Sequence, residues 1–113
     1  MSEYFPDRWV FVKVEGTIVP ETYYRIMASW YGGYAGSDSW KLSSGIESVT
    51  YDEASDCLVM PQSSGSTYRC FKQAYGMSNY TASVYHRYES QNSDEMRISV
   101  MDENFDIAAA LQK

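Results

Sequence analysis

The sequence is poor in the residues on which many enzymes and metal sites depend. Its 113 residues include one histidine and two cysteines. A single histidine excludes zinc sites that need two imidazole ligands, and two cysteines are too few for a disulfide framework. The signatures G-x-S-x-G, H-E-x-x-H, G-K-[ST] and C-x-x-C are also absent. These absences favour a protein without metal or cofactor and argue against an enzyme.

Long apolar runs are missing as well. No segment approaches the roughly 20 consecutive apolar residues of a membrane span. Residues 1–8 lack the basic start and the apolar stretch of a secretory signal. We therefore expect a cytoplasmic protein that does not contact membranes, with Cys57 and Cys70 as free thiols.

The chain also lacks an excess of positive charge. Its formal net charge is −6, and the charges are unevenly distributed along the sequence. Up to Tyr88 there are nine acidic and seven basic residues, and from Glu89 onward there are six acidic and two basic residues. A negatively charged protein lacks the positive electrostatic field that displaces counterions from phosphates, which argues against direct nucleic-acid binding. The acidic end fits a basic partner or simply a well-solvated surface.

Aromatic side chains are abundant. Eleven tyrosines, four phenylalanines and three tryptophans make up 16% of the residues. Tyrosine combines a large ring with a polar tip, so it suits a small β-rich core and a contact surface equally well. Together with the acidic end, this composition predicts a non-enzymatic binding or regulatory protein that acts through an aromatic-rich, acidic surface on a protein partner.

Alternating hydrophobicity predicts mainly strands. Residues 8–15 place Val10, Val12 and Val14 on one face. Residues 22–31 also alternate, although Ile26 to Trp30 fits a short helix too; the tyrosine and tryptophan content favours a strand. Shorter strands are expected over residues 39–43, 46–51, 56–60, 66–71 and 95–101, the last with Met96, Ile98 and Val100 inward.

The pattern changes to helical spacing once. Ser78 or Asn79 can cap a helix over about 78–91, with Tyr80, Val84, Tyr85 and Tyr88 on one face. The single domain, 1–113, is therefore expected to be α+β, a mainly antiparallel sheet with one principal helix packed on it. A small open β-barrel plugged by the helix is the alternative. Residues 105–111 are expected to form a short helical turn or a frayed tail.

The two cysteines fall in neighbouring predicted strands. If Pro61 pairs with Ser66 across the turn at 62–65, paired positions sum to 127, and Cys57 then lies opposite Cys70. Val59 and Tyr68 pair on the same face. Both thiols are most simply buried core residues, while a redox switch or a Cys70–His86 pair is the alternative.

A glycine-rich loop suggests a ligand site as the alternative function. Residues 32–36 hold three glycines between Trp30 and Trp40, and a pocket beside this loop would be lined by nearby rings. The candidate ligand-binding residues are Trp30, Tyr34, Trp40, Arg69, Tyr75 and His86. His86 lies off the apolar helical stripe and is expected to be partly exposed. Cys70, His86, Arg69 and Tyr75 are also the best candidates for catalysis.

The two longest predicted strands suggest a homodimer. If Val10, Val12 and Val14 share a face with Tyr24, Ile26, Ala28 and Trp30, the opposite face still carries large apolar side chains. One helix cannot cover both faces, so a second copy is expected to cover the other one. The candidate interface residues are Trp9, Phe11, Tyr23, Met27 and Tyr31.

Two segments resemble known sequences. Residues 30–46, from Trp30-Tyr31-Gly32-Gly33 to Ser44-Gly45-Ile46, and residues 64–78, from Ser64-Gly65-Ser66 to Gly76-Met77-Ser78, resemble parts of short uncharacterised proteins carried by phages and mobile gene cassettes. The resemblance implies an accessory role in a bacterial or phage setting. It implies no activity and no functional residues.

Overall fold

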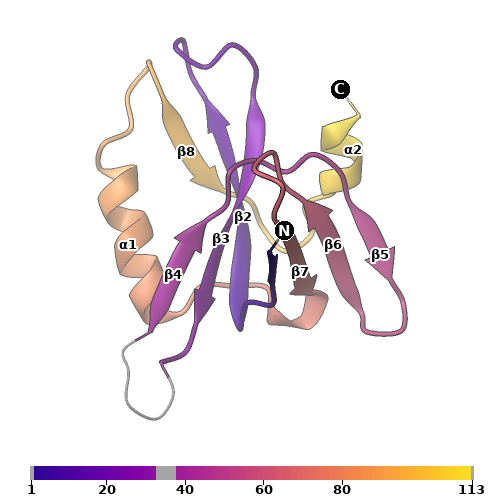
Figure 1. The fold of residues 1–113 in the computed structure, drawn as a ribbon. Helices are drawn as coiled ribbons and strands as arrows, with labels where there is room; N and C mark the ends of the chain where they lie inside the picture. Colours follow the sequence, from indigo (N-terminus) through magenta and orange to yellow (C-terminus); the bar gives the residue numbers. More distant parts are fainter. Residues whose placement is uncertain (1, 33–37, 113) are drawn as a thin grey trace.

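Two four-stranded sheets make up the computed structural model, which describes residues 2–32 and 38–112 (Figure 1). The first sheet has the order β4-β3-β2-β8, and all its neighbours are antiparallel. Its strands are β2 (Arg8–Glu15), β3 (Tyr23–Trp30), β4 (Ser39–Leu42) and β8 (Arg97–Val100).

The second sheet has the order β1-β7-β6-β5. Its strands are β1 (Glu3–Tyr4), β5 (Thr50–Asp52), β6 (Cys57–Pro61) and β7 (Thr67–Phe71). The β5–β6 and β6–β7 pairs are antiparallel, while β1 pairs with β7 in parallel. β1 could not be predicted, because two residues are too few to show an alternating pattern.

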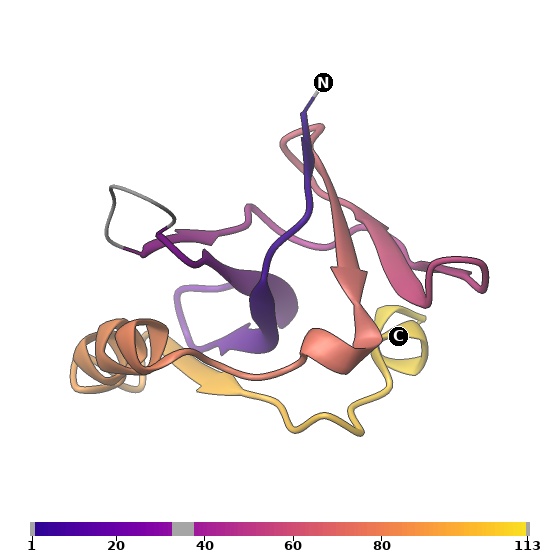
Figure 2. The same ribbon diagram turned by 90° about the horizontal axis from the view of Figure 1, so that it is seen from below.

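The described part of the chain also contains three helical segments: the 3-10 turn η1 (Lys72–Ala74), α1 (Asn79–Glu89) and α2 (Ile107–Leu111). Ser78 caps α1 by accepting a hydrogen bond from the Thr81 amide, and Asp106 caps α2 by accepting one from the Ala109 amide. The two α-helices lie at opposite ends of the molecule with the sheets between them (Figure 2). In the described part of the chain, no helix has the length and apolar character needed to cross a membrane.

Each face of the first sheet has its own core. On one face, Val10, Val12 and Met27 pack with Val84 and Tyr85 of α1. On the other, Trp9, Phe11 and Ile26 pack with residues of the second sheet, including Met60, Tyr68 and Cys70. β2 therefore has apolar side chains on both faces because it runs between two layers.

The expected fold class is confirmed, a mostly antiparallel α+β domain with one main helix. The first sheet is curled like half of a barrel (Figure 2), so the structure also agrees with the open-barrel alternative in this respect. Residues 23–30 form a strand and not a helix. The C-terminal helical turn is present as α2.

The expected pairing of β6 with β7 is wrong by one residue. Pro61 pairs with Thr67 and Leu58 with Cys70, so paired positions sum to 128 and Cys57 lies opposite Phe71. Val59 likewise pairs with Arg69 and not with Tyr68. The two cysteines are free and buried, but they are not opposite each other.

Three smaller expectations are corrected. Of the expected strand 46–51, only residues 50 and 51 lie in a strand, β5 (Thr50–Asp52), and Ile46 forms an isolated bridge with Gln62. Met96 is 44% exposed because it precedes β8 and does not point inward. On α1, Tyr80 and Tyr88 are exposed, and the buried face consists of Thr81, Val84 and Tyr85.

Candidate functional site

The expected pocket beside the glycine loop is not formed by its two tryptophans. Trp30 pairs with Ser39 and Trp40 with Ser29, which places the two indoles on opposite faces of the sheet. Trp30 packs against the core between the sheets, and its Nε1 donates to the Phe5 carbonyl at 3.1 Å. Trp40 packs on the α1 side, with its ring 5.8 Å from that of Tyr88. Tyr34 lies outside the described residues.

The other candidate ligand residues are dispersed. The Arg69 Nε lies 3.2 Å from the Glu3 Oε2 and ties β7 to β1. His86 is exposed on α1, as expected, with its Nδ1 3.5 Å from the Glu89 Oε1. Tyr75 lies between the sheets, against Trp9 and Phe11. These residues do not form one site.

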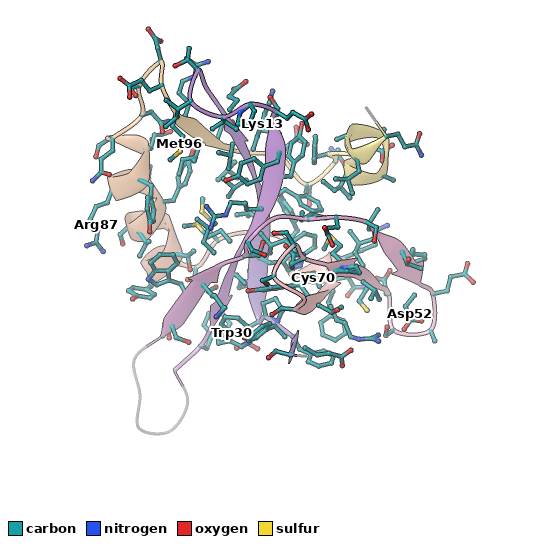
Figure 3. The ribbon with its side chains drawn as sticks, turned by 45° about the horizontal axis from the view of Figure 1, so that its top comes forward. Lys13, Trp30, Asp52, Cys70, Arg87 and Met96 are labelled. Atoms are coloured by element: carbon teal, nitrogen blue, oxygen red, sulfur yellow. The ribbon has the colours of Figure 1, made fainter. Side chains whose placement is uncertain are left out.

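The Cys70–His86 pair proposed for catalysis is also ruled out. Cys70 is fully buried in the core between the sheets, whereas α1 covers the opposite face of β2 and β3. Figure 3 shows Cys70 near the middle of the molecule and Arg87, the neighbour of His86, projecting from its edge. Burial raises the pKa of the Cys70 thiol, and the nearby Cys57 raises it further, so Cys70 is a poor nucleophile.

Most of the candidate dimer-interface residues are buried within the chain. Trp9, Phe11 and Met27 are 2%, 3% and 1% exposed, so they cannot form a surface. Tyr23 is half-buried beside the α1 core, and Tyr31 is exposed. The expectation failed because it placed even-numbered residues of β2 and β3 on one face, whereas Val10 pairs with Met27 and Phe11 with Ile26.

A cleft of about 510 Å³ lies between the two sheets. Aromatic rings line it from several elements: Trp9, Phe11, Tyr51, Tyr75 and Phe105. Aliphatic side chains form part of its walls: Val49, Leu58, Ile107 and Ala108. The polar and charged residues at the cleft are Lys72, Glu103, Asn104 and Asp106.

The rings of the cleft support one another by edge contacts. Trp9 and Phe11 are T-shaped with centroids 4.9 Å apart, and Trp9 and Tyr75 are T-shaped at 4.8 Å. Phe105 adds a third edge contact, 5.6 Å from Phe11. Aromatic pairs of this kind add stability beyond their buried area, so this floor is held in place before any ligand arrives.

The polar ends of the floor residues are already used. The Trp9 Nε1 donates to the Phe71 carbonyl at 2.8 Å. The Tyr75 hydroxyl accepts from the Phe11 amide at 3.0 Å and donates to the Met101 carbonyl. Burial raises the pKa of Tyr75 to about 12, so this hydroxyl stays protonated. These rings therefore offer the cleft carbon surface, and it comes from the partly exposed Tyr75 and Phe105 because Trp9 and Phe11 are almost fully buried.

The mouth of the cleft is polar and carries more acid than base. The Lys72 Nζ lies 5.1 Å from the centre of the Tyr51 ring, a cation–π contact. The Tyr51 hydroxyl donates to the Asp56 Oδ1 at 2.7 Å, and this bond raises the pKa of Tyr51. Glu103 and Asp106 are both exposed, so the carboxylates outnumber the single ammonium group.

Sequence reasoning missed most of this cleft. Trp9 and Phe11 were expected at a dimer interface, and Val49, Leu58 and Phe105 were not singled out at all. The available signal was Phe105 just before Asp106, because an apolar residue that precedes a helix cap often packs on the first turns of that helix and fixes how the chain enters it. Its partner across the cleft could not be identified, since the two sheets are joined only by tertiary packing.

No group of three or more metal-ligating side chains occurs within residues 2–32 and 38–112. Among the acidic residues at 52–56, Asp52 stabilises the turn instead, because it accepts hydrogen bonds from the Ala54 amide and the Ser55 hydroxyl.

Comparison of the whole chain with protein families, characterised proteins and solved structures finds no match. The resemblance to phage and cassette proteins therefore stays a prediction.

Proposed function

We propose that this protein is a small-ligand-binding module whose site is the cleft between the two sheets. The observation that supports this best is the aromatic floor, in which buried Trp9 and Phe11 hold the partly exposed rings of Tyr75 and Phe105 by edge contacts. The polar ends of Trp9 and Tyr75 are bonded elsewhere. A concave site that combines aromatic and aliphatic walls with convergent polar groups is a usual form of a small-molecule site. The cleft volume of about 510 Å³ lies within the usual range.

The chemistry of the cleft indicates the class of ligand. A flat aromatic compound would bury its ring against Tyr51, Tyr75 and Phe105, the lining rings that are exposed or partly exposed. The excess of carboxylate at the mouth disfavours an anion and favours a neutral or positively charged ligand. The polar group of the ligand would face Glu103 and Asn104, which are exposed at the opening.

Two neighbouring alanines of α2 allow a matched test. Ala108 lines the cleft and is exposed, whereas Ala109 is exposed on the same helix but does not line it. Ala108→Phe should fill the cleft without removing any core packing, and Ala109→Phe should leave the cleft open. Ligand-observed NMR with a set of neutral and cationic aromatic fragments would measure binding to each variant.

We expect fragments to bind the wild-type protein and Ala109→Phe, and Ala108→Phe to lose them. Equal binding to both variants would place the fragments elsewhere and overturn the cleft as the site. Failure of every fragment to bind the wild type would also count against the proposal.

A protein partner is the second candidate, and one observation favours it. Phe5 and Tyr31 are 50% and 55% exposed, and the Trp30 indole bonded to the Phe5 carbonyl joins their segments. Other rings, among them Tyr80 and Tyr88, are also exposed, but less than these two, so we place the aromatic contact surface expected from composition at Phe5 and Tyr31. A double variant, Phe5→Ser with Tyr31→Ser, should lose a partner that Ile18→Ser, exposed elsewhere, retains in a pull-down.

A further inference from the structure

A second cavity, of about 390 Å³, lies where the chain after β4 meets the turn between β6 and β7. Two hydrogen bonds hold these segments together: the Ser63 amide donates to the Gly45 carbonyl at 2.8 Å, and the Ser64 amide to the Ser44 Oγ at 3.0 Å. The cavity shares no lining residue with the aromatic cleft.

The side chains that line this cavity are basic and rich in hydroxyl groups. Arg25 and Lys41 contribute two positive charges, and no lining residue is acidic, although the protein as a whole carries −6. Hydroxyl groups come from four serines and Tyr68. This local charge is opposite to that of the molecule.

Neither cation has a carboxylate partner in the part of the chain that the structure describes. The Arg25 Nε donates to the Ser43 carbonyl, which fixes the guanidinium while its two amino groups have no bond among the described residues. The Lys41 Nζ lies 5.1 Å from the centre of the Tyr4 ring, and the Tyr4 ring lies 5.0 Å from that of Tyr68. Arg25, Lys41 and Tyr68 all line this cavity.

The Tyr68 hydroxyl is an unusual feature of this cavity. Tyr68 is 1% exposed, and its hydroxyl has no hydrogen-bond partner among the described residues. Buried polar groups nearly always have a partner, because an unpaired one costs stability. Burial raises the pKa of Tyr68 above its usual value. Arg25 lines the same cavity as Tyr68. At neutral pH the hydroxyl is protonated and free to donate.

We propose that this cavity binds the phosphate group of a small molecule, with Arg25, Lys41 and the Tyr68 hydroxyl as its donors. A guanidinium matches two oxygens of an oxyanion at once, and an ammonium adds a second positive charge. The hydroxyls of Ser44, Ser64 and Ser66 supply further donors, which suit the three terminal oxygens of a phosphate better than the two of a carboxylate. The bound phosphate would give the Tyr68 hydroxyl its missing partner.

Isothermal titration at constant ionic strength tests this with two probes, inorganic phosphate and glycerol phosphate, with acetate as the comparison anion. We expect saturable binding of phosphate and weaker binding of acetate. Tighter binding of glycerol phosphate than of inorganic phosphate would identify a phosphate ester as the ligand, and equal binding would identify the free ion. Absence of saturable binding of both phosphates, or acetate bound as tightly as they are, would overturn the proposal.

Tyr68→Phe is the most informative variant because it removes only the unpartnered hydroxyl. Without phosphate its melting temperature should equal or exceed that of the wild type, whereas its phosphate affinity should fall roughly tenfold, as for a lost hydrogen bond to a charged group. Tyr88→Phe, exposed on α1, is the matched control and should keep full affinity. A lower melting temperature of Tyr68→Phe without phosphate would mean that the hydroxyl already has a partner, and would contradict the proposal.

The cations are tested in the same way. Lys41→Gln and Arg25→Gln should each weaken phosphate binding roughly tenfold or more, while Arg97→Gln, an exposed arginine of β8, should leave it unchanged. Lys41 is exposed, so its variant is expected to fold even if the one at half-buried Arg25 does not. Equal affinity in Lys41→Gln and Arg97→Gln would mean that phosphate binds by general charge and not in this cavity.

Discussion

Two tyrosines of the core between the sheets, partly buried Tyr75 and fully buried Tyr68, differ in what their hydroxyls contact. The Tyr75 hydroxyl bonds to the Phe11 amide and the Met101 carbonyl, and so joins β2 to the chain after β8. The Tyr68 hydroxyl has no partner in the described part of the chain. The first arrangement is that of a structural group, and the second leaves a donor available to a ligand.

The Tyr75 environment predicts how stability depends on pH. Burial raises the pKa of Tyr75 from 10.0 to about 12, so the unfolded chain loses this proton before the folded one. The contribution of Tyr75 to the free energy of unfolding is therefore complete below pH 10 and is lost as the pH rises toward 12. Burial shifts the pKa of Tyr68 in the same direction.

Urea unfolding at a series of alkaline pH values would measure this loss. Tyr75→Phe should be less stable than the wild type at neutral pH, because it leaves the Phe11 amide without its partner. It should also lose less stability between pH 10 and 12. A wild type and a variant that lose stability in parallel would show that Tyr75 is not the responsible group.

The two thiols should be inert in the folded protein. Cys57 and Cys70 are 2% and 0% exposed, and burial raises the pKa of Cys70, so little reactive thiolate is available. A colorimetric thiol reagent should label neither residue in the native state and both after unfolding without reductant. Rapid labelling of native protein, or fewer than two thiols after unfolding, would contradict this.

At the scale of elements, one glycine explains why the sequence predicted the strands β6 and β7 but not their pairing. The Gly65 amide bonds to the Gln62 carbonyl and the Gln62 amide to the Ser66 carbonyl, while Gly65 has a φ of 95°. This is a turn followed by a one-residue bulge. The bulge adds one residue on the β7 side and shifts the pairing sum from 127 to 128. Alternation along each strand shows neither the bulge nor the resulting shift.

The same limit applies to β2 and β3. Their existence followed from period-two alternation, but which faces coincide depends on the connection between them. The observed pairs, such as Val10 with Met27, sum to 37, so even positions of one strand face odd positions of the other. The expected dimer surface required the even-numbered residues of both strands to lie on the same face. The aromatic cleft could not be predicted either, because its residues come from both sheets.

The helix α1 gives a stability prediction with an internal control. Val84 is 4% exposed against the first sheet, whereas His86, two residues further on, is exposed. Val84→Ala should lower the free energy of unfolding by about 2 kcal/mol, from lost burial and the cavity left behind. His86→Ala should change it by less than about 1 kcal/mol. Urea unfolding measures both, and a large loss at His86 would mean that α1 is packed differently.

At the scale of the whole molecule, the two cavities differ in the chemistry of the side chains that line them. The cleft between the sheets has an aromatic floor and an acidic mouth, while the cavity near the β6–β7 turn is basic and rich in hydroxyls. Composition alone showed an acidic, tyrosine-rich chain and could not separate these regions. The separation arises because β2 and β3 divide the rings between two cores and Arg25 and Lys41 lie together at one edge.

The elements that cover the two faces of the first sheet also bear on the oligomeric state of the protein. The homodimer was expected because one helix could not shield both faces of this sheet, but the second sheet and α2 of the same chain pack on the face that α1 leaves open. Trp9 and Phe11 are consequently buried without a second copy. We therefore expect one chain in solution, with a mass near 12.9 kDa by light scattering during gel filtration. A mass that doubles as concentration rises would place a dimer contact on residues that remain exposed, and Phe5→Ser with Tyr31→Ser would then test whether that contact is the aromatic patch.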